Sequence, residues 1–354
     1  MKKLTALWLV GLSFNVLAHQ APSVSVEKLI PIPEYSEHHG QASAAAALKA
    51  AQMFLASFSE AQRQQFTFLL EARERTEWSN LPAGIVERAG ISVGELSAEQ
   101  RGLLFDFLSA SLDRQGYQQV MNIMAAEAFL STDKRAARLK WAPENYWVSL
   151  YGEPSETSPW GWQFGGHHLA LNIAIEDNKV ETMSPSFIGT EPAIFSYRGV
   201  DYESVIDMHR IAYKVYLALE SAQRERASVV KVPKDILTGP GKDGVIPKQV
   251  GLKGSDMSAA QREALLAAIE QWVSVQPREN AQHRMREIAA QLDATYFAWT
   301  GTDEVNTPSY MRIQGPSLII ELLSTGGNVG ESASGKGHYH TIYRNPLNEY
   351  GLGN

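Results

Sequence analysis

Four histidines in two tight pairs have the residue type and spacing that best suit chemistry. His167 and His168 are adjacent in WGWQFGGHHLALN, and His338 and His340 flank one residue in GHYHTIYR; the chain has nine histidines in 354 residues. Imidazole nitrogens bind metal ions and transfer protons near neutral pH. The pairs therefore leave three alternatives: metal ligands, metal-free proton-transfer groups, or polar side chains of structural use only.

The alternation of a β-strand separates the first pair by face. Successive side chains of a strand point to opposite faces, so a strand over 167–175 puts His168 and Asn172 on one side, among alanines. His167 falls on the other side, which is apolar, and there it fits a core histidine hydrogen-bonded to backbone. We therefore expect His168 to be the better ligand of the two.

The second pair lies on one face of the last strand. His338 and His340 are two residues apart, so their Cα atoms are about 6–7 Å apart on a strand. Both can then reach one cation at roughly 2.0–2.1 Å. We predict a divalent metal site with His168, His338 and His340 as ligands, zinc being the expected ion and iron, copper or manganese alternatives. This requires the two distant segments to lie as neighbouring β-elements, with His167 in support.

Two charged residues in predicted strands are candidate catalytic groups. Glu321 lies in the apolar run LIIELLS, where a carboxylate is rarely buried without a partner. It is either a fourth ligand or general base, or one half of an ion pair with Arg312 or Arg344. Arg344 shares the face of His340, and a guanidinium there would bind an anionic substrate group or transition-state charge.

Three further side chains are candidates for substrate binding. Trp160 and Trp162 could form the walls of a pocket with flat apolar surface, although a role as core aromatics fits them equally well. Asn172 shares the roomier, more polar side of its strand with His168. We therefore expect a small-molecule or anionic substrate.

The first residues have the pattern of a secretory signal peptide. Lys2 and Lys3 precede an apolar run from Leu4 to Leu17, and small residues stand before a cleavage point after Ala18. The apolar run is too short for a membrane anchor. We predict a signal peptide over 1–18, an extended lead over 19–40, and a periplasmic or secreted protein. His19 would become the mature N-terminus, where amine and imidazole could chelate copper; chance at the junction is the simpler explanation.

Helices are predicted from capping signals. Ser59, Ser97 and Ser258 each precede Gln by three residues, which is the capping-box pattern at a helix N-terminus. Their spacing is irregular and therefore indicates a local device rather than a repeat architecture. Helices are expected over 201–225, 258–274 and 277–293.

Strands are predicted in two separate regions. Aromatic and β-branched residues bounded by Gly and Pro indicate a β-meander from Tyr146 onward, and ATYFAWTG, YMRIQGPSLIIELLS and HYHTIYR indicate three more strands. The predicted fold class is α+β: a helical N-terminal half packed on a mostly antiparallel sheet assembled from central and C-terminal strands. One domain is expected over 41–354.

Charge and cysteine content exclude several function classes. The formal net charge is −7, which argues against nucleic-acid partners because these require a basic face. The chain has no cysteine, so disulfides and thiolate chemistry are excluded. An HExxH motif is absent as well. Any metal must therefore be held by His and carboxylate.

Several segments resemble one protein family. PWGWQFGGHHLALNI, SPSFIGTEPA, VPKDILTGP, QGPSLIIEL and HYHTIYRNPLNEYG resemble domain-of-unknown-function family 3500, a family of exported bacterial and fungal proteins. The resemblance covers residues 41–354, with one departure at Glu349, where Asp is usual. The residues that match its most distinctive motifs are Trp160, Gly166, His167, His168, Asn172, Pro185, Phe187, Gly189, Glu321, His338, His340, Arg344 and Asn348. The resemblance implies an exported, single-domain protein and implies no reaction.

The leading hypothesis is an exported, metal-dependent enzyme, with hydrolysis as the expected reaction. Three neutral imidazoles and an open position lower the pKa of bound water toward 7. Two His plus Glu321 would instead suit non-haem iron and oxygen chemistry. The competing class is a non-enzymatic periplasmic metal- or solute-binding protein, in which a metal carrier would have a closed coordination shell.

Overall fold

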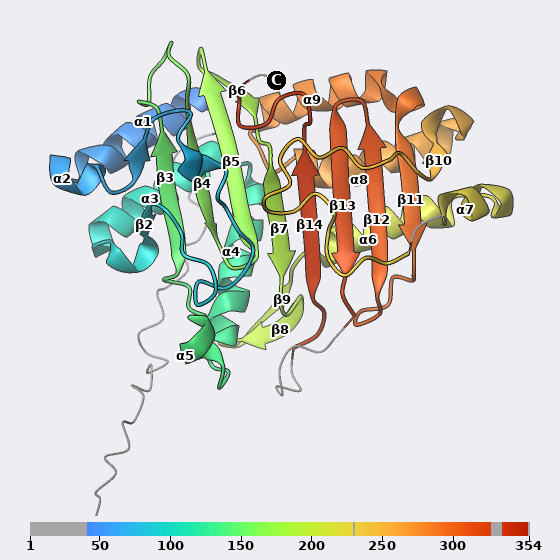
Figure 1. Ribbon diagram of the computed structural model, residues 1–354, viewed down its shortest axis with the longest axis horizontal. Coiled ribbons are helices and arrows are strands. Elements are labelled where there is room, and N and C mark those ends of the chain that lie inside the picture. Colours follow the sequence, from blue (N-terminus) through green and yellow to red (C-terminus); the bar gives the residue numbers. More distant parts are fainter. Residues whose placement is uncertain (1–40, 229–230, 327–334, 353–354) are drawn as a thin grey trace, which may run out of the picture.

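One long sheet connects the two halves of the chain (Figure 1). The computed structural model describes residues 41–228, 231–326 and 335–352, and within them the sheet has 12 strands. Every strand pair is antiparallel except β1 with β3. The order along the sheet is β1 (Thr67–Phe68), β3 (Tyr146–Tyr151), β4 (Trp160–Gly166), β5 (Leu169–Glu176), β7 (Ser186–Thr190), β14 (Tyr339–Arg344), β13 (Leu318–Ser324), β12 (Ser309–Gly315), β11 (Tyr296–Thr300) and β10 (Leu252–Lys253).

Three short pairings complete the β-structure. β2 (Ile91–Ser92) also pairs with β3, and β6 (Lys179–Thr182) pairs with β5. A separate hairpin is formed by β8 (Ile194–Tyr197) and β9 (Val200–Glu203). This hairpin begins a few residues after β7, below the central strands in Figure 1.

Most of the helices lie behind the sheet in Figure 1 and cover one of its faces. Within the described residues they are α1 (Ala44–Ala56), α2 (Glu60–Arg63), α3 (Ala98–Ser111), α4 (Arg114–Leu130), α5 (Ala136–Leu139), α6 (Ile206–Leu217), α7 (Ser221–Ala227), α8 (Ala259–Val273) and α9 (Arg278–Ala290). The predicted capping boxes at Ser59, Ser97 and Ser258 are confirmed at the starts of α2, α3 and α8. The α+β class is confirmed, with helices concentrated in the N-terminal half and a second group preceding β11.

Alternation along the strands gives the sheet two different faces. On the helix-covered face, Leu171 and Ile173 of β5 join Trp162 in the main hydrophobic core. On the opposite face, Phe187 and Ile342 pack in a second cluster of buried side chains. Two long, mostly irregular segments, residues 69–90 and 231–251, run across this second face (Figure 1). We call it the loop-covered face, and we call residues 231–251 the covering segment.

The two halves of the sheet repeat the same order of elements. In the first half, β2 leads through α3 and α4 to the strands β3, β4 and β5; in the second, β10 leads through α8 and α9 to β11, β12 and β13. β5 then pairs with β7, β13 pairs with β14, and β7 and β14 join the halves antiparallel to each other. An approximate two-fold axis between β7 and β14, perpendicular to the sheet, would give this arrangement. The two halves thus share an element order that the capping boxes alone did not predict.

Other details differ from the sequence-based expectations. His167 and His168 form the turn between β4 and β5 rather than the start of a strand. The expected helix over 201–225 begins only at Ile206 and is two helices, and the run 310–324 is two strands joined by a turn. The predicted signal peptide (1–18), the lead (19–40) and His19 lie outside the described residues. Within the described part of the chain, none of the helices has the length and apolar character needed to span a bilayer.

Candidate metal centre

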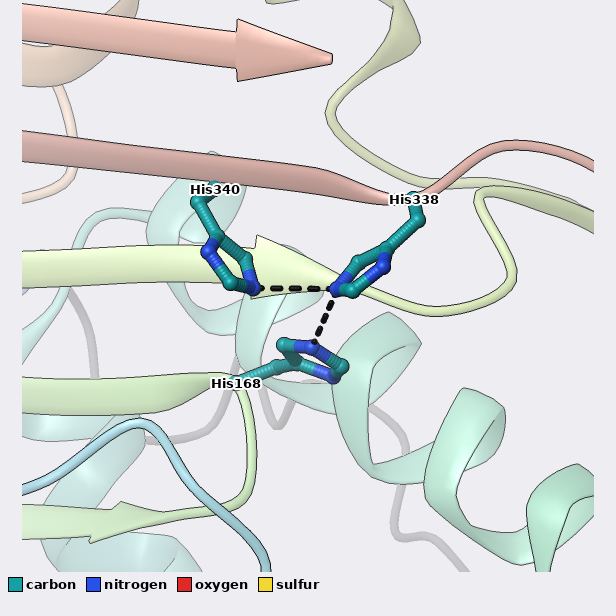
Figure 2. A group of neighbouring side chains, drawn as sticks. All are labelled: His168, His338 and His340. Atoms are coloured by element: carbon teal, nitrogen blue, oxygen red, sulfur yellow. Dashed lines mark hydrogen bonds between the residues drawn. The ribbon is translucent and has the colours of Figure 1, made fainter. Parts of the chain in front are cut away.

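The three histidines predicted as ligands converge at one end of the central strands (Figure 2). His168 comes from the β4–β5 turn, and His338 and His340 come from the start of β14. Strand β7 lies between β5 and β14, so the two segments are not direct neighbours as expected. In the register of β7 and β14, His340 stands opposite Gly189.

Gly189 explains how the rings meet across the intervening strand. A Cβ at this position would lie 3.2 Å from Cδ2 of His168 and 2.8 Å from the carbonyl oxygen of Tyr339. The missing side chain leaves space for the His168 ring to reach β14. The backbone N–H of Gly189 also donates to the carbonyl of His168 at 2.7 Å, and His168 has a left-handed φ of 62°. The turn thus directs the His168 ring over β7.

The facing nitrogens cannot all be paired by two-centre hydrogen bonds. Nε2 of His338 lies 3.1 Å from Nε2 of His168 and 3.0 Å from Nε2 of His340. A ring nitrogen carries either one hydrogen or one lone pair, so Nε2 of His338 can form a two-centre hydrogen bond to only one of these neighbours. Ligand nitrogens at 2.0–2.1 Å from a tetrahedral zinc ion are roughly 3.3–3.4 Å apart. Two of the three separations are therefore close to, and slightly shorter than, those around one cation, and the three ligand atoms all lie within 4.8 Å of one another.

An aspartate fixes the tautomer of one of these rings. Nδ1 of His340 lies 2.8 Å from Oδ1 of Asp235, and this carboxylate favours the tautomer with hydrogen on Nδ1. Nε2 of His340 then presents a lone pair toward the other two histidines. Metal-binding histidines usually donate their second N–H in this way. Asp235 lies in the covering segment, and sequence reasoning had not singled it out.

A second carboxylate lies beside the three histidines. Oε2 of Glu191 is 3.9 Å from Nε2 of His338, and ligand atoms of Glu191, His167 and His168 lie within 4.8 Å of one another. Glu191 follows β7 directly and is buried enough for its pKa to be raised. It can serve either as a fourth ligand or as a base next to an open position. The segment SPSFIGTEPA, which carried part of the family resemblance, contains it.

His167 belongs to the wall of the site. Its Nδ1 lies 2.8 Å from Oε2 of Glu127 on α4, and both side chains are buried. Its ring stacks on Trp141 with centroids 5.9 Å apart. The expected backbone hydrogen bond of the His167 ring is thus replaced by a buried carboxylate partner. With His168 and Glu191, His167 forms a second possible ligand group.

The electrostatics favour neutral imidazoles. Burial and the neighbouring imidazole of His340 lower the pKa of His338 to about 3. Burial and the surrounding histidines lower the pKa of His168 well below its ordinary value. For Asp235, burial raises the pKa, but its hydrogen bond and attraction to His340 outweigh burial and leave the pKa lowered. Neutral imidazole is the form that binds a metal ion.

The cluster is accessible at the surface. The side chains of His338 and Asp235 are 25 % and 51 % exposed, so a small molecule can approach the nitrogens. A cleft of about 690 Å³ lies elsewhere, between β6, the end of β14 and α9, with Arg284 and Asn345 in its lining. Pockets are common hypotheses for active sites. Here the unusual chemistry lies in the histidine cluster, and we place the site there.

The structure places the two predicted substrate-binding tryptophans away from the histidines. Trp160 and Trp162 are almost fully buried in the main core. Trp162 packs against Phe107 of α3, with ring centroids 5.4 Å apart. Both therefore lie on the helix-covered face, whereas the ring of His340 contacts Phe187 on the loop-covered face. Their geometry supports the core alternative and does not support a pocket wall.

Asn172 and Glu321 have their polar groups occupied within the protein. Nδ2 of Asn172 donates to the carbonyl of Pro185 at 2.8 Å, and its Oδ1 accepts from Gln163 at 2.6 Å. The carboxylate of Glu321 is fully buried and accepts hydrogen bonds from the covering segment and from Tyr310. The geometry thus supports neither a substrate contact for Asn172 nor ligation or base catalysis by Glu321. It likewise replaces the expected ion pair of Glu321 with neutral donors.

The guanidinium of Arg344 also has its hydrogen-bond donors paired within the protein. Its guanidinium donates to the carboxylates of Asp243 and Glu349 and to the carbonyls of Thr238 and Gly239. The residue is 1 % exposed. These partners leave little of the guanidinium for an anionic substrate, so the expected role in substrate binding has no support in the geometry.

Comparison with known proteins gives one match. Residues 40–352 match the model of a family described as proteins of unknown function. No curated protein and no solved structure matches the chain. The match covers nearly the whole chain and confirms the resemblance seen in the sequence.

Proposed function

This chain belongs to the family DUF3500, whose description names no reaction, and we propose from the site alone that the protein is a metal-dependent hydrolase. His168, His338 and His340 would hold a divalent ion, with zinc as the expected one. The single observation that carries the proposal is the convergence of three Nε2 atoms with spacings of 3.0 and 3.1 Å. An ion held in this way supplies Lewis acidity and lowers the pKa of water beside it.

Two carboxylates of the protein, those of Asp235 and Glu191, would assist the reaction. Asp235 holds His340 in the tautomer that directs its lone pair inward. Glu191, close to Nε2 of His338, would accept the proton of an attacking water molecule and then pass it to the leaving group. The partial exposure of His338 provides access for a small substrate. Hydrolysis requires no reductant or oxygen, which keeps the chemistry within what these side chains provide.

Glu191 also supports a second candidate function. A carboxylate that completes three imidazoles would close a tetrahedral shell, as in a structural or transport site. In that case the protein would be a metal carrier rather than an enzyme. The two functions differ in what Glu191 does, so a single substitution separates them.

Replacing Glu191 with Gln is expected to lower hydrolysis while leaving metal affinity within about threefold of wild type. A lost general base costs roughly 10²- to 10⁴-fold in rate. The measurements are turnover of p-nitrophenyl carboxylate and phosphate esters with and without zinc, and zinc affinity by competition with a chelator. A large loss of affinity without any zinc-dependent turnover would identify the carrier. Equal turnover with and without zinc would exclude a metal-dependent reaction on these esters.

We also propose that the protein is exported, on the pattern of residues 1–18. Expression of the full chain in a Gram-negative bacterium is expected to give a mature protein that begins at His19 and is released by osmotic shock. Intact mass and N-terminal sequencing of that fraction check the cleavage point. A chain that retains Met1 and stays with the cytoplasmic fraction would refute export.

A further inference from the structure

We infer that Glu321 and Arg344 are positioning residues for the metal site, acting through the covering segment and Asp235. The inference rests on the proposed metal site and deepens it. Glu321 and Arg344 are in the sheet, whereas Asp235 lies in the irregular segment that crosses it (Figure 1). The contacts below connect them in a continuous series.

Glu321 binds the backbone just after Asp235. Its Oε2 accepts the N–H of Leu237 at 2.8 Å, and its Oε1 accepts the N–H of Thr238 at 2.8 Å. The hydroxyls of Thr238 and Tyr310 also donate to the carboxylate. A fully buried carboxylate is tolerated only with such donors, and most of them belong to the covering segment. Leu237 and Thr238 are therefore held firmly over β13.

Arg344 binds the next part of the same segment. Its Nε donates to the carbonyl of Thr238 at 2.7 Å and its Nη2 to that of Gly239 at 3.1 Å. Its Nη1 bonds to the carboxylate of Asp243 at 2.8 Å. The sheet thus holds the N–H groups of Leu237 and Thr238 and the carbonyls of Thr238 and Gly239.

Asp235 depends on this attachment. Its side chain is 51 % exposed, so burial does not dictate where the carboxylate points. Its direction follows from the backbone, which is fixed two residues later, and from its contacts with His340 and the N–H of Ile236. Loosening the segment would therefore free the carboxylate from Nδ1 of His340, and the His340 ring would lose its fixed tautomer.

The test is a double-mutant cycle on the full chain, with zinc affinity measured by chelator competition and the cobalt form examined by its visible spectrum. Asp235→Ala is expected to weaken zinc binding roughly 10- to 100-fold, as removal of an outer partner does. Glu321→Gln turns one acceptor into a donor that faces N–H groups. It is expected to weaken zinc binding as well, by a smaller factor than Asp235→Ala. In the Asp235→Ala background, Glu321→Gln should have no further effect on affinity.

Gln314→Leu is the matched control. Gln314 holds the other end of the covering segment, donating to the carbonyl of Pro247 at 2.7 Å. Its loss should lower stability and leave zinc affinity and the cobalt spectrum unchanged. Wild-type affinity in the Asp235→Ala variant, or an equal loss from Glu321→Gln in both backgrounds, would overturn the inference. A wild-type protein that binds neither zinc nor cobalt would instead overturn the proposed metal site itself.

Discussion

Replacing His338 with alanine is expected to weaken zinc binding by more than about 100-fold, the largest effect on the site. His338 is the central ligand, since its Nε2 is within 3.1 Å of both other nitrogens. Loss of a ligand should exceed the roughly 10- to 100-fold cost of losing an outer partner. Zinc at 100 times the wild-type Kd should stabilise wild type by about 2.7 kcal/mol and the variant by less than about 0.4 kcal/mol.

The metal-free variant should be about as stable as metal-free wild type. The His338 side chain is 25 % exposed, and its removal relieves the contact between nitrogens that cannot all hydrogen-bond. His283→Ala is the control, because this histidine on α9 is 69 % exposed and lies beside Glu287, away from the cluster. Urea unfolding with and without zinc measures the stability of the metal-free protein and its stabilisation by zinc. Metal content after purification gives the amount of zinc bound. Equal zinc content in wild type, His338→Ala and His283→Ala would rule out the metal centre.

Periodicity predicted the faces of the strands correctly because burial follows it directly. The alternation over 169–175 separated Leu171 and Ile173 from Ala170 and Asn172, and the structure has the first two in the core behind the helices. The same rule placed His340, Ile342 and Arg344 on one face, which is the loop-covered one. What it could not predict is which strand lies between two distant segments. The position of β7, and the need for Gly189 within it, depend on sheet order.

The carboxylates of the site carried no periodic signal. Asp235 lies in an irregular segment, Glu191 follows a strand end, and Glu127 is one of several polar residues on a helix. The first two were present in the segments VPKDILTGP and SPSFIGTEPA that carried the family resemblance. A search for acidic residues in those segments would have found them. Glu321 and Arg344 were predicted to be catalytic because a charge in an apolar strand suggests chemistry. In the structure, both side chains instead bind the covering segment.

The shared element order of the two halves was not recognised in the sequence because one of the four capping residues is Glu rather than Ser. Ser59 precedes Ser97 by 38 residues, and the same interval separates Glu220 from Ser258. Glu220 forms a capping box with Gln223 at the start of α7, so its carboxylate does what the hydroxyl of Ser59 does. A search restricted to Ser found three starts at irregular spacing. With Glu220 included, the 38-residue interval occurs once in each half of the chain.

Replacing Arg344 with methionine is expected to destabilise the protein by about 3–5 kcal/mol, the cost of leaving buried charges without their partner. Although burial lowers the pKa of Arg344, the carboxylates of Glu349 and Asp243 outweigh it and hold the pKa above its ordinary value. Without the guanidinium, Glu349, whose side chain is 8 % exposed, would lack its counter-charge. Urea unfolding of the zinc-free protein measures the change in free energy.

Arg73→Met is the matched control, because Arg73 forms an exposed pair with Glu77, with 85 % of its side chain accessible. Such a pair contributes about 0–1 kcal/mol. Changing Glu349 to Gln together with Arg344→Met should recover part of the loss, since the unpaired charge is then removed. A cost no larger than that of Arg73→Met, combined with selective loss of binding to anionic ligands, would restore the substrate-binding role that the sequence suggested. Arg344→Lys keeps the charge but not the fork of donors. Its free energy of unfolding should therefore lie between that of wild type and that of Arg344→Met.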